Sequence, residues 1–461
     1  MARAGRALSR RMSDHLHHRV EVAGPDAVAS LEQLLSHNAR RTPDALALLD
    51  PPDRPRFTDS GPRRLTYAQL ERTVSAAAQR LDELALPPGS VVGLQLPNTG
   101  EAIVMLLAVM RARLIAALLP LRWREADIGS ALHSVDAAAL ITCQRIGTVE
   151  HAHIALAVAL EVTCVRYLCG FGPTLPDGFV PLDDVFETDG HLSTENQSRQ
   201  TPCPIGVITF DRQSRGPVPF ARSHIELFAG GLAVMMEARL QRGATILSTI
   251  ATGSFAGLAS AVIPWLLTGG ALALHHPFDP EVFREQLRDE AADAIVIPQA
   301  ILEPLLADEH VWNGTTAPTV LSLWRPPAQQ ASAPSLAIPS RLVDVVALAE
   351  WAVVPMRRDA GAAPALLRPG AWTPSGAVEG TPALLRLGQT PHQTVAIGGA
   401  MTPHEPFSSG AQAFRYTEEG LVETGIAWPR TGDSFHSNRS AASLESPFEL
   451  DHIEVPRASV A

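Results

Sequence analysis

The sequence has few cysteines, and their spacing is irregular. Cys143, Cys164, Cys169 and Cys203 are the only four in 461 residues. They are too few to staple a chain of this length, and none of the intervals between them is that of a zinc site. This scarcity excludes a disulfide-rich scaffold and favours a reducing compartment, so we predict a cytoplasmic protein.

No uninterrupted apolar run is long enough to suggest a membrane span. Residues 102–121 carry Arg111 and Arg113 near their middle, and the shorter stretch 259–274 is broken by Pro264. A spanning helix needs about 20 mostly apolar residues. Both stretches are therefore predicted to be buried helix and strand, and no transmembrane segment is expected.

Clustered positive charge is also scarce. The formal net charge is −11, and a basic cluster occurs only in the first twenty residues. Nucleic-acid binding usually needs grouped cationic side chains to replace phosphate counterions, so it is not expected. The segment 1–24 lacks the apolar core of a secretory signal and is predicted to be a mobile tail. An organellar address and a misplaced start codon remain alternatives.

The rest of the chain alternates helical and strand-like patterns, with 46% hydrophobic residues. Such alternation implies crossover connections and a mainly parallel sheet, so the predicted class is α/β, with two α/β sheet subdomains and a small β subdomain. The predicted parts are a first α/β subdomain (25–186), a linker (187–202), a second α/β subdomain (203–356), a small β-rich subdomain (357–433) and a polar tail (434–461).

The stretch "VITFDRQSRGPVPFARSH", residues 207–224, is predicted to be a strand, a loop and the start of a helix. Ser223, with Glu226 three residues later, has the form of a capping box. The loop is where a phosphate-binding segment would be expected, yet this stretch contains one glycine, two prolines and no lysine.

Several segments, in their order along the chain, resemble the adenylate-forming superfamily, which includes acyl-CoA synthetases and the other AMP-dependent synthetases and ligases. They are "LTYAQLERTVSAAAQRL", "PPGSVVGLQLPN", "SALHSVDAAALIT" and "FAGLASAVIPWLLTGGALALHH". The resemblance implies the fold of that family's large N-terminal part. It also implies a reaction in which ATP and a carboxylate form an acyl-adenylate, from which a thiol such as CoA displaces AMP. ATP or AMP and magnesium are the implied cofactors.

The phosphate loop of that family departs from its usual form here. Laid on the family's Gly- and Ser-rich loop, residues 211–220 keep Gly216, with Ser214 as a near match, while Pro219 stands in the place of the lysine. We favour a solvated connecting loop, because losing one preorganised donor typically costs about 10²- to 10³-fold in rate and several are lost together. In the alternative, Arg212 and Arg215 take over the phosphate contacts.

Later motifs of the family are retained in part. Its magnesium-holding glutamate would be Glu350, for which a surface or capped carboxylate is an equal alternative. Its ribose-binding aspartate would be Asp433 in "RTGDSF", although "VETGIAW" around Thr424 fits the context better. The turn that lies against adenine would fall at Arg325 but is not recognisable.

Only 28 residues follow Asp433, too few to form the mobile C-terminal domain typical of the family, so that domain is expected to be absent. We predict a catalytically impaired relative that binds an acyl or aryl carboxylate, a nucleotide or a partner protein. The first alternative is an active acid-thiol ligase that uses CoA and a non-standard site. The second is a purely structural subunit.

Overall fold

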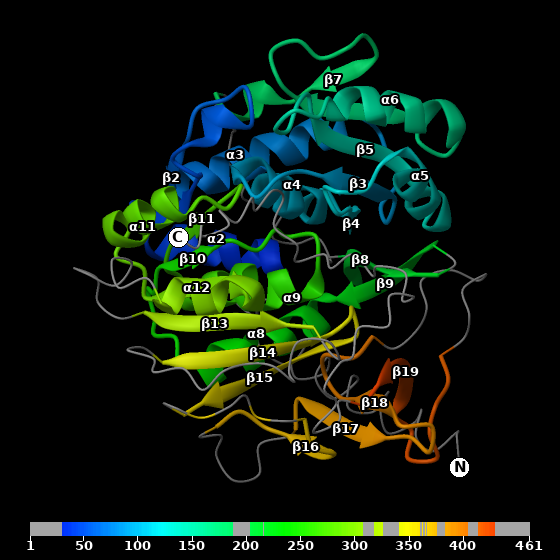
Figure 1. Ribbon diagram of the computed structural model, residues 1–461. Helices are drawn as coiled ribbons and strands as arrows, with labels where there is room; N and C mark the ends of the chain where they lie inside the picture. Colours follow the sequence, from blue (N-terminus) through cyan, green and yellow to red (C-terminus); the bar gives the residue numbers. More distant parts are fainter. Residues whose placement is uncertain are drawn as a thin grey trace, which may run out of the picture.

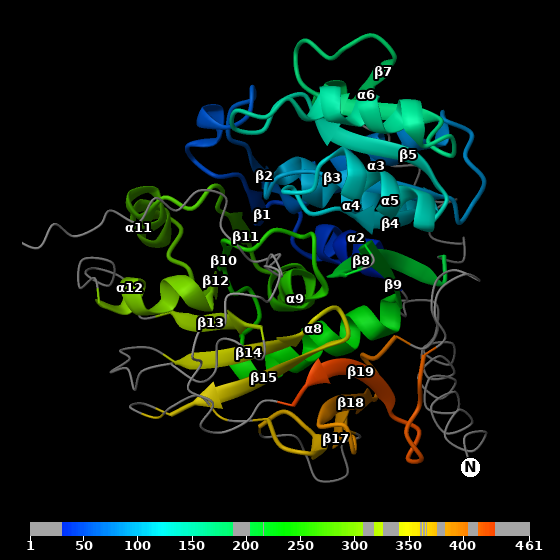
Figure 2. The ribbon, with the colours of Figure 1, turned by 45° about the vertical axis from the view of Figure 1, so that its right-hand side comes forward.

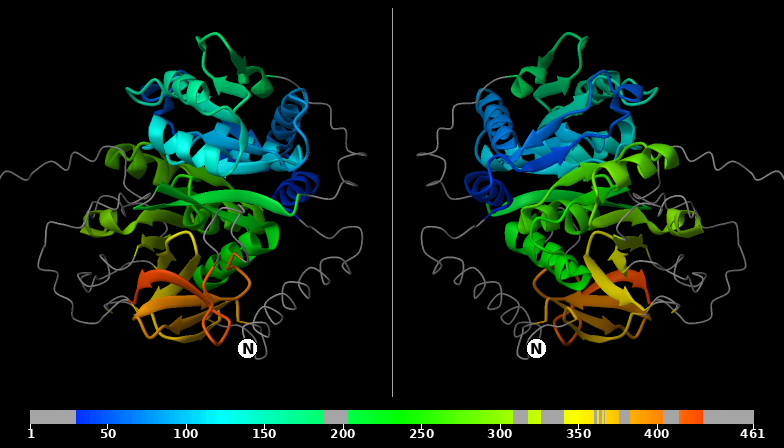
Figure 3. Two further views of the ribbon diagram at one scale, coloured as in Figure 1. Left: turned by 90° about the vertical axis from the view of Figure 1, so that its right-hand side faces the viewer. Right: turned by 90° about the vertical axis from the view of Figure 1, so that its left-hand side faces the viewer.

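Three β-sheets organise the described part of the chain in the computed structural model (Figure 1). The structure describes residues 30–187, 203–214, 216–307, 318–325, 341–359, 362, 365, 367–375, 383–403 and 414–428. Seen from the side, the sheets follow one another from the top of the molecule to the bottom (Figure 3). The predicted α/β class is confirmed.

The first sheet has the strand order β7-β6-β5-β3-β4-β8-β9 among the described residues. The pairs from β7 to β8 are parallel, and β9 is antiparallel to β8. Its strands are β3 (Val91–Gln95), β4 (Ile115–Leu118), β5 (Ala137–Cys143), β6 (Tyr167–Phe171), β7 (Phe179–Pro181), β8 (Ile205–Gln213) and β9 (Gly216–Ser223). The helices of this part are α3 (Tyr67–Asp82), α4 (Gly100–Arg111), α5 (Glu125–Ser134) and α6 (His151–Glu161).

The second sheet has the order β15-β14-β13-β12-β10-β11-β1-β2 and is parallel except at its two edges. Its strands are β1 (Leu46–Leu49), β2 (Arg64–Thr66), β10 (Ile246–Ser248), β11 (Leu272–Leu274), β12 (Ala294–Pro298), β13 (Thr319–Trp324), β14 (Leu342–Leu348) and β15 (Ala352–Arg358). The range 25–186, predicted as one subdomain, thus contributes strands to both large sheets.

Helices of the second part surround this sheet, and α8 packs against β14 and β15. They are α2 (Leu31–Arg41), α8 (His224–Ala238), α9 (Phe255–Gly257), α10 (Ile263–Thr268), α11 (Pro280–Asp289) and α12 (Leu302–Ala307). A π-helical turn joins α9 to α10. The third sheet is antiparallel, in the order β16 (Gly370–Trp372), β17 (Leu385–Gln389), β18 (Thr394–Gly398) and β19 (Val422–Ala427).

Two helix starts follow directly from local sequence. Thr66 accepts from the backbone N–H of Gln69, whose side chain accepts from the N–H of Thr66, and Ser223 and Glu226 do the same at the start of α8. The predicted capping box at Ser223 is confirmed. Such reciprocal caps satisfy backbone donors that have no partner within the first helical turn.

The arginine inside the apolar run of α4 is compensated. Arg111, at the end of that helix, forms an ion pair with Glu71 on α3, with 2.8 Å between Nη2 and Oε2. Residues 100–110 of α4 are buried, as predicted. Within the described residues, no helix has both the length and the apolar character needed to cross a bilayer.

The segment expected to be a loop is a β-hairpin. β8 and β9 pair from Ile205↔Ser223 to Gln213↔Gly216, which leaves a two-residue connection. Gly216 supports this tight reversal with a φ of +113°. The prediction of a solvated connecting loop at residues 211–220 was therefore wrong, because antiparallel pairing continues almost to the tip.

Candidate functional site

The carboxyl ends of the parallel strands in the second sheet form the candidate site. From β10 the chain passes to β11 on one side and then to β12 on the other, so the direction of winding reverses at β10. In open α/β sheets, ligands bind outside the carboxyl ends of strands at such a switch point. Phe255, Arg325 and Glu350 all lie in segments that leave these ends, after β10, β13 and β14 respectively.

Glu350 is buried in the turn between β14 and β15, with 2% of its surface exposed. Its Oε2 accepts a hydrogen bond of 2.8 Å from the backbone N–H of Phe255, the first residue of α9. Burial raises the pKa of this carboxyl, while the Phe255 N–H and the neighbouring Thr209 hydroxyl act in the opposite direction. Glu350 is thus a capped, desolvated carboxyl group, and a surface position is excluded.

The hairpin brings a second carboxylate to this place. Arg325, just after β13, donates from Nη2 to Oδ1 of Asp211 on β8 at 2.8 Å. Burial raises the pKa of Asp211 and the Arg325 guanidinium opposes that rise. The Arg325 side chain is 21% exposed, so it reaches solvent at the rim of the site. Strand β8 of the first sheet is therefore joined to the second sheet by this ion pair.

Arg212 is not brought to this place. Successive side chains of a strand point to opposite faces, so Arg212 points away from the face that carries Thr209 and Asp211. Its Nη1 lies 3.1 Å from Oδ2 of Asp127 on α5. Ser214 and Gly216 lie at the hairpin tip, and Arg215 and Asp433 lie outside the described residues.

The alternative ribose-binding segment around Thr424 is part of the third sheet. Thr424 lies in β19, and its hydroxyl donates to the carbonyl of Val395 on β18 at 2.8 Å. Gly425 follows with a φ of +75°. A contact within the sheet thus accounts for Thr424, and a backbone conformation that favours glycine accounts for Gly425.

Sequence reasoning missed Arg222, on β9. Its side chain is fully buried, and its guanidinium donates to the backbone carbonyls of Glu350, Trp351 and Met401. A signal was available, because Arg222 shares the alternating face of Phe220, two residues earlier, whose ring packs edge-on against Trp351. An arginine continuing the buried face of a strand indicates a specific set of acceptors.

A second unused signal is the complete absence of lysine. All 37 residues counted as lysine or arginine are arginine, as the printed sequence shows. Any cationic contact that this chain makes with a phosphate group must therefore come from a guanidinium group, a histidine or the N-terminus. Arginine offers a planar fork of donors, whereas lysine offers a compact point charge.

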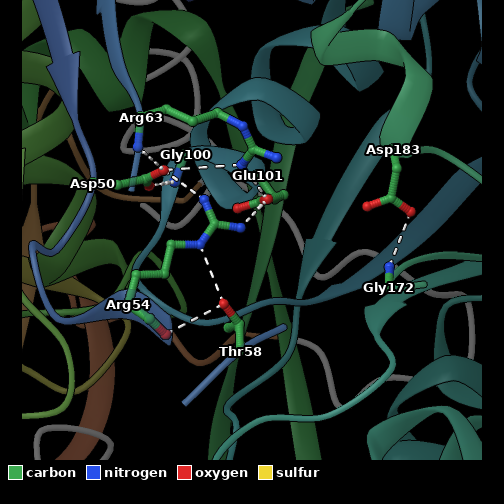
Figure 4. Close-up of polar contacts among 8 residues, drawn as sticks. All are labelled: Asp50, Arg54, Thr58, Arg63, Gly100, Glu101, Gly172 and Asp183. Atoms are coloured by element: carbon green, nitrogen blue, oxygen red, sulfur yellow. Dashed lines mark hydrogen bonds and ion pairs between the residues drawn. The ribbon is translucent and has the colours of Figure 1, made fainter. Parts of the chain in front are cut away.

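A separate buried ionic cluster lies between β1 and α4 (Figure 4). Arg54 donates to Asp50 and Glu101, Arg63 donates to Glu101 at 2.7 Å, and Asp50 accepts from the backbone N–H of Gly100 at 2.6 Å. Two carboxylates and two guanidinium groups balance each other. The cluster ties the second sheet to the first, and its charged side chains bind one another.

The histidine pair at the end of β11 is also structural. His275 makes a 3.0 Å hydrogen bond through Nδ1 to Gln286, and its Nε2 accepts from the N–H of Asp279 at 3.1 Å. Both ring nitrogens are therefore engaged by the protein. Within the described parts of the chain, no group of three or more His, Cys, Asp or Glu side chains could hold a metal ion.

Comparison with known proteins places this geometry in context. Residues 35–181 match the family described as AMP-binding enzyme. The chain is 28% identical over 251 residues to a salicyl-AMP ligase / salicyl-S-ArCP synthetase of Mycobacterium tuberculosis, which covers 54% of this chain and 43% of that protein. It is 23% identical over 298 residues to a 2-hydroxy-7-methoxy-5-methyl-1-naphthoate–CoA ligase of Streptomyces carzinostaticus, covering 63% and 52%.

The chain thus spans about half the length of these two relatives. Among solved structures, MbtA of Mycobacterium smegmatis in its apo form superposes with a TM-score of 0.68 at 17% identity, over 88% of this chain and 74% of that one. At this identity the likeness shows a shared fold.

Proposed function

We propose that this chain, a relative of the adenylate-forming superfamily, binds an adenylate beside Glu350, at the carboxyl ends of the strands of the second sheet, while turning ATP over poorly. The ligand class is AMP or an acyl- or aryl-adenylate, with the acid moiety drawn from aryl or acyl carboxylates. Two relatives whose names specify an aryl acid, salicyl-AMP ligase and a naphthoate–CoA ligase, support the aryl class.

The β8–β9 hairpin is the observation that carries the proposal of poor turnover. A triphosphate is held by several backbone N–H groups that converge from a flexible, glycine-rich loop. Here the ladder between β8 and β9 extends to Gln213↔Gly216, so these N–H groups point along a sheet and do not converge. Pro217 and Pro219 supply none at all. A departing pyrophosphate therefore lacks its usual donors.

The residues that remain suit a monophosphate ester better. The Arg325 guanidinium reaches solvent beside Glu350 and supplies one cationic contact. In the structure, that guanidinium donates a hydrogen bond to Asp211. This bond would have to break before the guanidinium could bind the ligand. One such contact suits one phosphate group and is too little for the larger charge of a triphosphate.

Magnesium does not fit this arrangement. Glu350 already accepts from the Phe255 N–H, and the guanidinium groups of Arg222 and Arg325 act on the same carboxyl. Positive charges beside a single buried carboxylate oppose a divalent cation. No step of the proposed function passes through a metal ion.

A second candidate is an active acid-thiol ligase with a rebuilt site, in which CoA accepts the acyl group. The partial exposure of Arg325 favours it, because a guanidinium at the rim could take a phosphate contact made by lysine elsewhere in the family. A partner protein that supplies further groups belongs to the same candidate.

Calorimetry and a pyrophosphate assay separate the two. We expect AMP and aryl-adenylate analogues to bind, and ATP with Mg²⁺ to bind less tightly. A ligand with a Kd of about 10 μM at about 1 mM should raise the free energy of unfolding by about 2.7 kcal/mol. Pyrophosphate release with aryl and fatty acids plus CoA should stay at background. Release at an ordinary enzymatic rate, lost in Glu350→Ala, would establish the ligase instead.

A further inference from the structure

Arg222 lies where all three sheets approach one another. It belongs to β9 of the first sheet, and it contacts the β14–β15 turn of the second sheet and Met401, which follows β18 of the third. These strands are labelled in Figure 2. The side chain has no exposed surface. Burying a guanidinium group costs free energy unless nearly all of its donors are hydrogen-bonded. The burial of Arg222 therefore calls for a structural explanation.

Its hydrogen bonds are all to backbone carbonyls. Nη1 donates to Met401 at 2.7 Å, and Nη2 donates to Trp351 at 3.0 Å and also to Glu350. Backbone carbonyls cannot move without their chain segments. The planar fork therefore fixes the relative positions of the hairpin, the turn that carries Glu350 and the segment after β18.

The flat face of the guanidinium makes a fourth contact. Its central carbon lies 3.5 Å from the ring centroid of Phe255, the residue whose N–H binds the Glu350 carboxyl. Arg222 thus touches both partners of that hydrogen bond. It holds the ring of Phe255 from one side and the carbonyl of Glu350 from another.

Aromatic packing continues the same connection toward the third sheet. The ring of Phe220 lies 4.7 Å from that of Trp351, which in turn lies 4.8 Å from the ring of Phe414. Phe414 belongs to the segment that leads into β19. Movement of the hairpin would therefore be passed to both other sheets.

We propose that Arg222 is the positioning residue of the adenylate site, coupling the orientation of Glu350 and Phe255 to the docking of the β16–β19 sheet. The proposal rests on the proposed function for its ligand, but not for the coupling between sheets. Arg222 itself makes no contact with the ligand. It acts by keeping the Glu350 turn and α9 in register with the hairpin.

Burial lowers the pKa of Arg222 to about 10, with Glu226 and Glu350 opposing that effect. The guanidinium remains charged at neutral pH even so. A lysine at this position would keep the charge and lose the planar fork, which isolates geometry from charge.

Arg222→Lys is the primary test, with Arg358→Lys as its matched control. Arg358 is equally buried, but it pairs with Asp344 and lies opposite Leu342, at the amino end of β14 and far from Glu350. Both variants should lose stability. Only Arg222→Lys should weaken AMP binding, by about 10- to 100-fold, which is the usual effect of removing a group that orients a binding residue.

Hydrogen exchange of the folded proteins gives the second readout. Arg222→Lys should speed exchange at least about tenfold in residues 255–258 and 399–403, while Arg358→Lys should leave both segments at wild-type rates. Added methylguanidinium should restore AMP affinity and slow exchange in Arg222→Ala, because it can fill the space left by the side chain.

The outcomes are separable. If wild-type protein binds neither AMP nor adenylates, the proposed function fails, and exchange in 399–403 still decides the role of Arg222. If folded Arg222→Lys keeps wild-type affinity and exchange, the inference is wrong. Should that variant not fold, Phe255→Leu removes the ring but keeps the N–H to Glu350. Unchanged exchange in that variant would likewise overturn the coupling.

Discussion

Asp211 and Arg325 form an ion pair between the first and second sheets, with 2.8 Å between Oδ1 and Nη2. Asp211 comes from the edge hairpin of the first sheet, and Arg325 comes from the carboxyl end of a central strand of the second. They are 114 residues apart in the chain. The Asp211 carboxylate is therefore bound to the Arg325 guanidinium, which is the group that we propose binds the ligand phosphate.

Asp211→Asn should therefore bind AMP more tightly than wild type, by up to about tenfold, because the phosphate no longer competes with a carboxylate. Arg325→Gln should bind it about 10- to 100-fold more weakly, as expected for loss of a hydrogen bond to a charged group. Titration calorimetry measures both, and the double variant completes the cycle.

The matched control for that experiment is Arg212→Gln. Arg212 pairs with Asp127 on the other face of β8, so its loss should change AMP affinity less than twofold. A larger loss in Arg212→Gln than in Arg325→Gln would reverse the assignment and return the phosphate contact to Arg212.

Glu350→Gln should change how stability depends on pH. Burial raises the pKa of Glu350, so the folded state holds the proton more tightly than the unfolded state does. The stability of the wild type must then fall, relative to the glutamine variant, as pH rises above the ordinary value of 4.5. Glutamine keeps an oxygen that can accept from Phe255. Urea unfolding from pH 4.5 to 8 measures the difference, and a constant difference would contradict the prediction.

Arg54→Met should destabilise the fold by about 3–5 kcal/mol, because it leaves the buried carboxylates of Asp50 and Glu101 without the more buried of their two guanidinium partners. Arg64→Met is the control, since Arg64 is 58% exposed in its pair with Glu290 and should change stability by less than about 1 kcal/mol. Equal losses in urea unfolding would show that the Arg54 cluster is not desolvated in solution.

Acid should begin to destabilise the protein at a pH well above the range in which ordinary carboxyl groups titrate. Burial lowers the pKa of His151, His224, His275 and His276 to about 4. Each folded-state pKa is depressed, so stability is complete above the usual value of 6.5 and is lost as pH falls toward 4. Each histidine contributes a slope of up to about 1.4 kcal/mol per pH unit.

Two substitutions in α6 check that prediction. His151→Gln should make the acid limb less steep, because it removes one buried histidine bonded to Gln95. His153→Gln, two residues later and exposed, should leave the limb unchanged. Identical acid limbs for wild type and His151→Gln would show that His151 is accessible to protons in the folded state.

Local signals in the sequence predicted a large share of the fold. The helix capped at Ser223, the burial of the apolar run that contains Arg111 and the alternation that defines an α/β protein all depend on residues within one or two turns of each other. The order of motifs then indicated the superfamily whose AMP-binding family model matches residues 35–181. These features can be predicted from the sequence because the residues that cause them are close together in the chain.

The hairpin was not predicted because local sequence does not show what causes it. Residues 211–220 are rich in arginine and proline, which are typical of loops, but Pro217 and Pro219 are acceptable on a strand that forms the edge of a sheet. The edge position is a property of the assembled sheet. A strand in the middle would have lost ladder hydrogen bonds at both prolines.

The sequence by itself determined the class of fold, the start of the helix at Ser223 and the absence of lysine from any phosphate contact, since composition and short-range pattern suffice for these. Tertiary structure alone decided that Asp211 meets Arg325, that Glu350 is buried on the Phe255 N–H, and that Arg222, not Arg212, is bonded to the segment that carries Glu350. Strand alternation and crossover topology set those meetings, because they choose which face each side chain takes and which distant strand ends lie together.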